Sequence, residues 1–104
     1  MTKIVRLTLF KIDNPDTVQE AINMYSTLAQ DATKDGKKYI QLSQANAPYD
    51  DHRSKGYNLM ARCVFDSLED MNYFDQDDEA HGKIKTHLVP KFIEKPLVIY
   101  SDMQ

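Results

Sequence analysis

Residues 3–11 alternate two sets of side chains with a period of two, which is typical of a β-strand. One set includes Val5, Leu7 and Leu9, and the other carries Arg6 among mostly apolar neighbours. Because both sets are mainly apolar, a sheet that contains this strand has apolar groups on both of its faces. Helices that cover one face would leave the other face to a partner, so we expect a homodimer that forms through the sheet face.

A helix follows the first strand, and strong local signals mark its start. Asn14 is a good helix cap, Pro15 suits the first helical position, and Asp16 places an acid in the first turn. Apolar residues then recur at helical spacing as far as Ala32. We expect Gly36 to end this helix in a left-handed conformation.

The rest of the chain contains three further strands and a second helical region. Alternation predicts strands over residues 38–44 and 56–65, separated by a long polar loop, and a final strand over residues 97–100. Pro90 ends the helical region, and Pro96 precedes the final strand. The order is therefore βαββααβ. It predicts one α+β domain over the 104-residue chain, a ferredoxin-like split βαβ sandwich with a four-stranded antiparallel sheet.

The segment from Phe65 to His81 is the richest in chemical signals. Ser67 can cap a helix, and Asp70 occupies the reciprocal position of a capping box. The expected buried side of that helix consists of Leu68, Met71 and Phe74. His81 then opens a second stripe, which continues with Ile84 and Leu88. The spacing predicts an imidazole that faces the protein interior.

The composition narrows the range of partners. The formal net charge is -3 and both signs are mixed, so no basic stripe can neutralise phosphates and nucleic acid is not an expected partner. The amino-terminal residues carry several charges and lack the apolar run of a signal peptide or membrane span, so we expect a cytoplasmic protein without a membrane partner. Cys63 is the only cysteine, which excludes an intrachain disulfide and a thiolate zinc cluster. The histidines form no ligand set, so no metal is expected.

Four segments, taken in their order and spacing, resemble one family. They are the TLFKI strand, the GY that opens the third strand, the FDSLEDMNYF helix, and the EAH that precedes the last helix. From about residue 3 to about residue 101, the chain resembles the stress-responsive A/B barrel (Dabb) domain family, most closely its uncharacterised fungal members. The resemblance implies a dimeric α+β barrel with a ligand cavity between each sheet and its helices.

The resemblance also implies site residues. One branch of the family, the plant olivetolic acid cyclase, folds a linear polyketide with a histidine and a tyrosine, and His81 matches that histidine. Tyr25 matches a tyrosine of the cyclase cavity, whereas the catalytic tyrosine aligns with Phe74, one residue after Tyr73. Leu59 stands where the cyclase carries a further histidine. The implied catalytic residues are His81 with Tyr73 or Tyr25, and the implied ligand-binding residues are Tyr25, Phe74 and Leu59.

The two charged candidates each have a functional and a simpler structural interpretation. His81 could be an acid or base of an aldol cyclisation, or a half-buried histidine that bonds a backbone carbonyl. Arg6, if its side of the strand faces the helices, could bind a carboxylate or phenolate of a ligand. It could instead pair with Glu79, Glu94 or another acid at the rim. The sequence leaves both pairs of interpretations open.

Three classes of function fit these features. The first is a cofactor-free lyase or cyclase that acts on a polyketide-like or aromatic small molecule, with His81 as its acid or base. The second is a protein that binds a hydrophobic ligand without changing it. The third is a stress-response protein whose useful property is a stable oligomer. No cofactor is expected in any of them.

Overall fold

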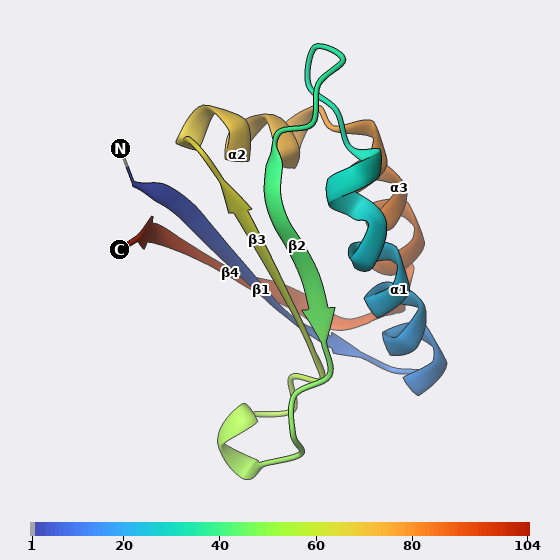
Figure 1. Cartoon of the computed structure of the whole chain (residues 1–104). Coiled ribbons are helices and arrows are strands. Elements are labelled where there is room, and N and C mark those ends of the chain that lie inside the picture. The colour runs from blue at the N-terminus through green and yellow to red at the C-terminus, as the bar shows by residue number, and fades with distance from the viewer. Residues whose placement is uncertain (1) are drawn as a thin grey trace.

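The structure is a computed structural model that describes residues 2–104. Its helices and strands occur in the predicted βαββααβ order (Figure 1). The elements are β1 (Lys3–Ile12), α1 (Pro15–Asp31), β2 (Ile40–Asn46), β3 (Leu59–Phe65), α2 (Leu68–Gln76), α3 (Glu79–Leu88) and β4 (Phe92–Met103). Two short 3₁₀ turns, η1 (His52–Ser54) and η2 (Val89–Lys91), precede β3 and β4. The predicted ferredoxin-like α+β fold is confirmed.

The four strands form one antiparallel sheet in the order β2-β3-β1-β4. β1 therefore lies inside the sheet, between β3 and β4. Its Arg6 has Cys63 of β3 as its cross-strand neighbour on one side and Tyr100 of β4 on the other. Pairing of Lys3 with Met103 brings the two termini to the same end of the sheet (Figure 1).

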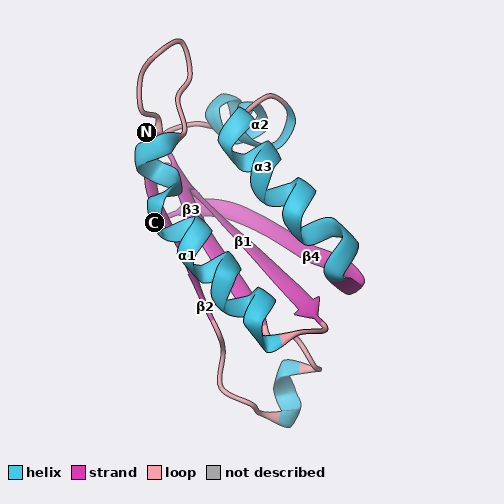
Figure 2. Cartoon of the chain, turned by 90° about the vertical axis from the view of Figure 1, so that its right-hand side faces the viewer, coloured by secondary structure: helices cyan, strands magenta, loops and turns pink. Residues whose placement is uncertain are grey.

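The helices cover one face of the sheet, with α1 and α3 side by side (Figure 2). On this face every second residue of β1 is buried, as the period-two pattern predicts. The buried β1 residues are Ile4, Arg6, Thr8, Phe10 and Ile12. Aromatic side chains fill the space between the layers, among them Tyr25, Phe65 and Phe74, each at most 2% exposed. Arg6 is therefore held in an otherwise mostly apolar layer.

The opposite face of the sheet carries apolar side chains without helices above them. Val5, Leu7 and Leu9 lie on this face of β1 and are only partly covered. Ile99 and Leu97 are the β4 neighbours of Leu7 and Leu9, and they remain 51% and 44% exposed. This distribution agrees with the expectation that apolar groups occur on both faces.

The start of α1 is as predicted, but its end is not. Asn14 caps the helix by accepting a hydrogen bond from the Asp16 amide at 2.8 Å. The helix stops at Asp31, because Ala32 is already extended. Gly36 does have a positive φ of 76°, but it forms the tight turn of a small hairpin beyond the helix. The prediction that Gly36 ends α1 was therefore wrong.

The predicted cap of α2 is present, although only half of the capping box forms. Ser67 Oγ accepts a hydrogen bond from the Asp70 amide at 3.1 Å. The Asp70 carboxylate instead accepts from Lys34 Nζ at 2.9 Å, which joins α2 to the segment after α1. Met71 is buried as expected, but Leu68 is 51% exposed because it lies in the first turn, at the edge of the layer.

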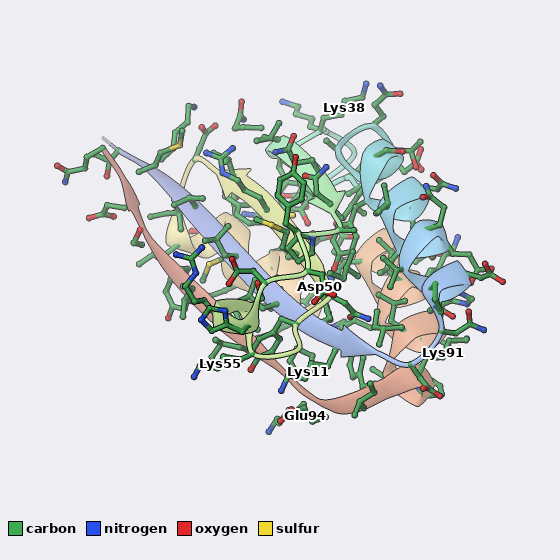
Figure 3. The ribbon with its side chains drawn as sticks, turned by 90° about the horizontal axis from the view of Figure 1, so that it is seen from below. Lys11, Lys38, Asp50, Lys55, Lys91 and Glu94 are labelled. Carbon is green, nitrogen blue, oxygen red and sulfur yellow. The ribbon has the colours of Figure 1, made fainter. Side chains whose placement is uncertain are left out.

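The strand boundaries shift where the sheet is irregular. β2 begins and ends two residues later than predicted, and its pairing with β3 shifts register between Ile40 and Leu42. β4 is much longer than predicted and includes Pro96, which an edge strand tolerates because its amide need not pair. Where β1 and β4 lose regular register, Lys11 and Glu94 form an ion pair at the end of the sheet (Figure 3). Within residues 2–104, no helix is both long and apolar enough for a bilayer crossing.

Candidate functional site

The first turn of α3 places His81 in the interior. Asp78 caps this helix, and its Oδ1 accepts a hydrogen bond from the His81 amide at 2.8 Å. The His81 residue is 3% exposed, and Ile84 and Leu88 continue the same buried stripe. The inward orientation that the spacing predicted is therefore confirmed.

The surroundings of His81 determine which ring nitrogen carries the proton. Nδ1 lies 2.9 Å from the main-chain carbonyl oxygen of Phe74, and a carbonyl can only accept a hydrogen bond. In the neutral ring the proton is therefore on Nδ1, and Nε2 keeps a free lone pair. Within residues 2–104 Nε2 makes no hydrogen bond, and it is not among the fully covered atoms that lack a partner, so it keeps some accessible surface. The imidazole also stacks on the Phe74 ring, with centroids 3.7 Å apart and planes 13° apart.

The site holds His81 in its neutral form at pH 7. Burial, together with the positive charges of Arg6 and Lys85, lowers the pKa of His81 to about 4. The hydrogen bond to Phe74 and the carboxylate of Asp75 act in the opposite direction but do not compensate. Nε2 is thus available as a proton acceptor rather than as a donor.

Beside His81 the structure contains an apolar hollow of about 120 Å³, bounded by β1, α1, α3 and β4. We call it the His81 hollow. It is lined by Arg6, Thr8, Phe10, Tyr25, His81, Ile84, Lys85, Leu88, Val89, Phe92, Pro96 and Val98. Three of the candidates, His81, Arg6 and Tyr25, therefore line the same space. The predicted hollow beneath the helices exists, and the imidazole forms part of its wall.

Arg6 is the buried cation in that wall. Its side chain is 8% exposed, and its Nη2 pairs with Asp75 Oδ1 at 2.7 Å. Nη1 donates to Thr8 Oγ1 at 2.8 Å, whereas the buried Nε–H has no acceptor within the described residues. The ion-pair interpretation is confirmed, with Asp75 as the acid in place of Glu79 or Glu94.

Tyr25 is a further lining residue of the hollow. The residue is 2% exposed, and burial, more than the neighbouring Cys63, raises the pKa of its phenol well above the ordinary value. The hydroxyl therefore keeps its proton over the whole physiological range and can donate a hydrogen bond to a ligand. Its helix is tied to the sheet through the Tyr25 carbonyl, which accepts from Ser43 Oγ at 2.9 Å.

The other candidates, Tyr73, Phe74 and Leu59, do not line the hollow. Tyr73 donates its hydroxyl to the main-chain carbonyl of Thr33 at 3.1 Å and does not line the His81 hollow. Phe74 is fully buried beneath the His81 ring, and Leu59 is fully buried in the core as the cross-strand neighbour of Phe10. The structure does not bring Tyr73 or Leu59 to His81.

Tyr73 lines a larger cleft of about 560 Å³, between α1 and the α2–α3 turn. Acidic residues border this helix cleft, namely Asp31, Asp77, Asp78 and Glu79. Among residues 2–104 no three His, Cys, Asp or Glu side chains are grouped closely enough to hold a metal ion. Although the helix cleft is larger, the free imidazole nitrogen and the buried cation belong to the His81 hollow.

Sequence reasoning missed several residues of the His81 hollow. Lys85 follows His81 by one helical turn, and this i, i+4 spacing could have identified it. Pro96 and Val98 reach the hollow from β4 because Val98 is the cross-strand neighbour of Thr8. No local signal identifies them, since their placement depends on which strand pairs with β1.

With this geometry established, comparison with known proteins places the chain in a family. Residues 1–102 match the stress responsive A/B barrel domain, or Dabb. The chain belongs to this family. The resemblance seen in the sequence is therefore confirmed, and the match covers nearly all of this Dabb protein.

Relatives of this Dabb protein include a fungal protein and plant and bacterial structures. A Gibberella zeae protein described as "Fusaristatin A biosynthesis cluster protein" is 28% identical over 102 residues, which are 98% of this chain and 74% of the relative. A hydroxynitrile lyase from Passiflora edulis is similar with a TM-score of 0.76 and 12% identity, covering 99% of this chain and 94% of the lyase. A dimeric ferredoxin-like protein of unknown function from Jannaschia sp. CCS1 is similar with a TM-score of 0.76 and 15% identity, covering 97% of this chain and 99% of the Jannaschia protein. At such identities the structures show the fold alone.

Proposed function

We propose that this Dabb protein binds a small molecule in the His81 hollow and acts as a cofactor-independent lyase or cyclase, with Nε2 of His81 as the proton acceptor. The observation that carries the proposal is that His81, whose Nε2 makes no hydrogen bond within the described residues, lines a mostly apolar space. A neutral imidazole whose other nitrogen is fixed by a carbonyl has the arrangement of a positioned general base.

The step that fits this wall is proton removal from a carbon next to a carbonyl group. Nε2 would take the proton, and the C–H electron pair would move into the enolate. The Tyr25 hydroxyl is the donor that we assign to the enolate oxygen, because its proton is retained and Tyr25 lines the same hollow. The enolate carbon can then attack a second carbonyl carbon of the same chain. The imidazolium returns its proton to the new alkoxide. The reaction thus balances in protons and electrons without a cofactor.

The descriptions of two relatives support a role in small-molecule chemistry. The Gibberella zeae protein is described by its place in a biosynthesis cluster, and the Passiflora edulis protein is described as a lyase. A polyketide-like or aromatic carbonyl compound is the ligand class that suits both the apolar lining and the proposed proton transfer.

One observation favours a second candidate, which is a protein that holds such a ligand without changing it. The pKa of His81 is about 4, so the free imidazole is a weak base at pH 7. A ligand-holding protein needs the apolar hollow but not the basicity of Nε2. The two candidates therefore differ in whether a bound carbonyl compound loses a proton.

Deuterium exchange of methyl acetoacetate tests the proton transfer directly. This compact β-keto ester is dissolved in D₂O with the protein, and loss of its α-hydrogen signal is followed by proton NMR. We expect the wild type to accelerate exchange above the buffer rate, and His81→Asn to reduce this acceleration at least about 100-fold. Asparagine suits the test because its amide can still donate to the Phe74 carbonyl while Nε2 is removed.

The matched control is His87→Asn, which changes a surface histidine on the same helix that contacts Glu20 at 3.1 Å. This variant should keep the wild-type acceleration. If His81→Asn exchanged as fast as the wild type, Nε2 would not be the base. If the ester bound without any accelerated exchange, the ligand-holding function would be favoured.

We also infer that the protein works as a homodimer formed through the open face of the sheet. The support is the set of exposed apolar residues on that face, including Leu97 and Ile99 of β4. The Jannaschia protein of the same fold is described as dimeric. Burying this face against a second copy would remove the apolar area from water.

A further inference from the structure

We infer that the natural occupant of the His81 hollow is an anion: a compact carboxylate or enolate whose negative group lies near the Arg6 and Lys85 side of the hollow. The inference rests on the proposed function, because it concerns the ligand of the same site. It is carried by the charges of the lining residues, by the absence of an acid among them and by the size of the space.

The lining contains cations but no acid. Arg6 and Lys85 both line the hollow, and every other lining residue is neutral or, in the case of His81, held neutral. Asp75 is not among the lining residues and compensates only Arg6, through its 2.7 Å ion pair. Lys85 Nζ donates instead to the main-chain carbonyl of Asp75 at 2.6 Å. One positive charge at the hollow therefore has no carboxylate partner in the described chain.

The charges near the hollow also affect the protonation of His81. Around its ring are Arg6 from β1, Tyr25 from α1, Asp75 and the Phe74 carbonyl from α2, and Lys85 from α3. Both cations disfavour the imidazolium more than Asp75 favours it. A base in this position gains from an anionic ligand, because the ligand charge offsets the two cations when Nε2 takes a proton.

Arg6 contributes its charge to the same wall. Its side chain is 8% exposed, and both terminal nitrogens already have partners, Thr8 for Nη1 and Asp75 for Nη2. The Nε–H has no acceptor within residues 2–104, but it is fully covered, so an anion in the hollow interacts with the charge of the guanidinium and not with this donor.

The space limits the size of the ligand. A 150 Å³ cavity holds a molecule of about the size of benzene, so a hollow of about 120 Å³ takes about five non-hydrogen atoms, and the remaining atoms of a larger compound stay at its opening. A longer molecule can enter only with one end. That end passes Lys85, Val89 and Val98, which are exposed and border the opening of the hollow.

A pair of shape-matched compounds tests the inference. 3-Methylbutanoate and 3-methylbutanamide have the same carbon skeleton, but only the first is charged at pH 7. Each compound is titrated into the wild-type protein in its solution oligomeric state, at equal ionic strength. Binding is followed through the NMR signals of the main-chain amides of Ile84 and Leu88. We expect the carboxylate to bind about tenfold more tightly than the amide.

Three variants separate the contributions. Lys85→Gln should reduce the preference for the carboxylate severalfold, whereas Lys83→Gln should not, because Lys83 lies on the same helix but lines the helix cleft. Asp75→Asn should increase the preference, because it removes the charge that compensates Arg6 and leaves the hollow lining intact. Both lysines are exposed, so these two variants should fold.

The outcomes distinguish this inference from the proposed function. If neither compound shifts the signals of Ile84 and Leu88, the hollow takes no ligand and the proposed function fails as well. If both bind equally, the hollow is a binding site but the anion inference is overturned. Equal losses in Lys85→Gln and Lys83→Gln would also overturn it, because they would show attraction by overall charge.

Discussion

Tyr39 donates its hydroxyl to Asp78 Oδ2 at 2.5 Å, which joins the chain just before β2 to the cap of α3. The other oxygen of the same carboxylate accepts the amide of His81. Burial and the bond to Asp78 raise the pKa of Tyr39, so its hydroxyl always carries the donated proton. The orientation of His81 therefore depends on a residue far away in the sequence.

Replacing this carboxylate should be more costly than replacing an ordinary helix cap. Asp78→Ala removes the cap of α3 and leaves the buried Tyr39 hydroxyl without its acceptor. We expect a loss of about 2–4 kcal/mol in the free energy of unfolding, measured with urea at pH 7. Asp78→Asn should lose less than half as much, because asparagine caps helices equally well. Equal losses in the two variants would contradict this account.

The buried histidine should make stability depend on pH. Its folded-state pKa is about 4, against an ordinary value of 6.5, so the unfolded chain binds the proton first as the pH falls. Its contribution is complete above pH 6.5 and is lost progressively down to about pH 4, where the folded state also takes the proton. The total loss should be about 3 kcal/mol.

Urea unfolding of wild type and His81→Asn at pH 7 and pH 4.5 measures this contribution as the difference between their two pH dependences. Subtracting the variant removes the effect of the carboxylates, which both proteins share. An identical pH dependence would show that His81 is not held neutral by the fold.

Local signals predicted the elements of this fold well because short-range chemistry decides them. Period-two alternation correctly placed Arg6 and Leu7 on opposite faces of the sheet. The capped helix start at Ser67 correctly placed Phe74 on the buried side of α2. What failed depended on tertiary contacts. Gly36 turned out to serve a small hairpin, and the acid that pairs with Arg6 is Asp75, 69 residues away in the sequence. No spacing rule connects residues so distant, so the choice among rim acids needed the structure.

The Arg6–Asp75 pair should respond unequally to loss of its two partners. Asp75→Ala leaves a guanidinium that is 8% exposed without its counter-ion, and we expect a loss of about 3 kcal/mol. Arg6→Met should lose clearly less, because the Asp75 side chain is 36% exposed and keeps its water contacts. Methionine also fits the apolar lining. Urea unfolding at pH 7 checks the order, and a larger loss in Arg6→Met would reverse the argument.

The open face of the sheet should control the oligomeric state. Ile99→Lys puts a charge beside Leu7 in the middle of the exposed apolar residues, so burial of this face would require burial of an unpaired charge. We expect sedimentation equilibrium at micromolar concentration to show a dimer for the wild type and a monomer for the variant. Leu68→Lys is the control, because Leu68 is equally exposed but lies on α2. A dimer in both variants would place the interface elsewhere.

The two tyrosines should differ in their effect on α-hydrogen exchange because they line different spaces. Tyr25→Phe removes the only phenol that lines the His81 hollow among the described residues, so the enolate would lose its donor. We expect the exchange of methyl acetoacetate to slow by about tenfold or more. Tyr73→Phe should leave the rate within about twofold, because its hydroxyl bonds the Thr33 carbonyl beside the helix cleft. If Tyr73→Phe slowed exchange and Tyr25→Phe did not, the chemistry would belong to the helix cleft. The imidazole would then be a structural residue that fixes α3 to the end of α2 through the Phe74 carbonyl.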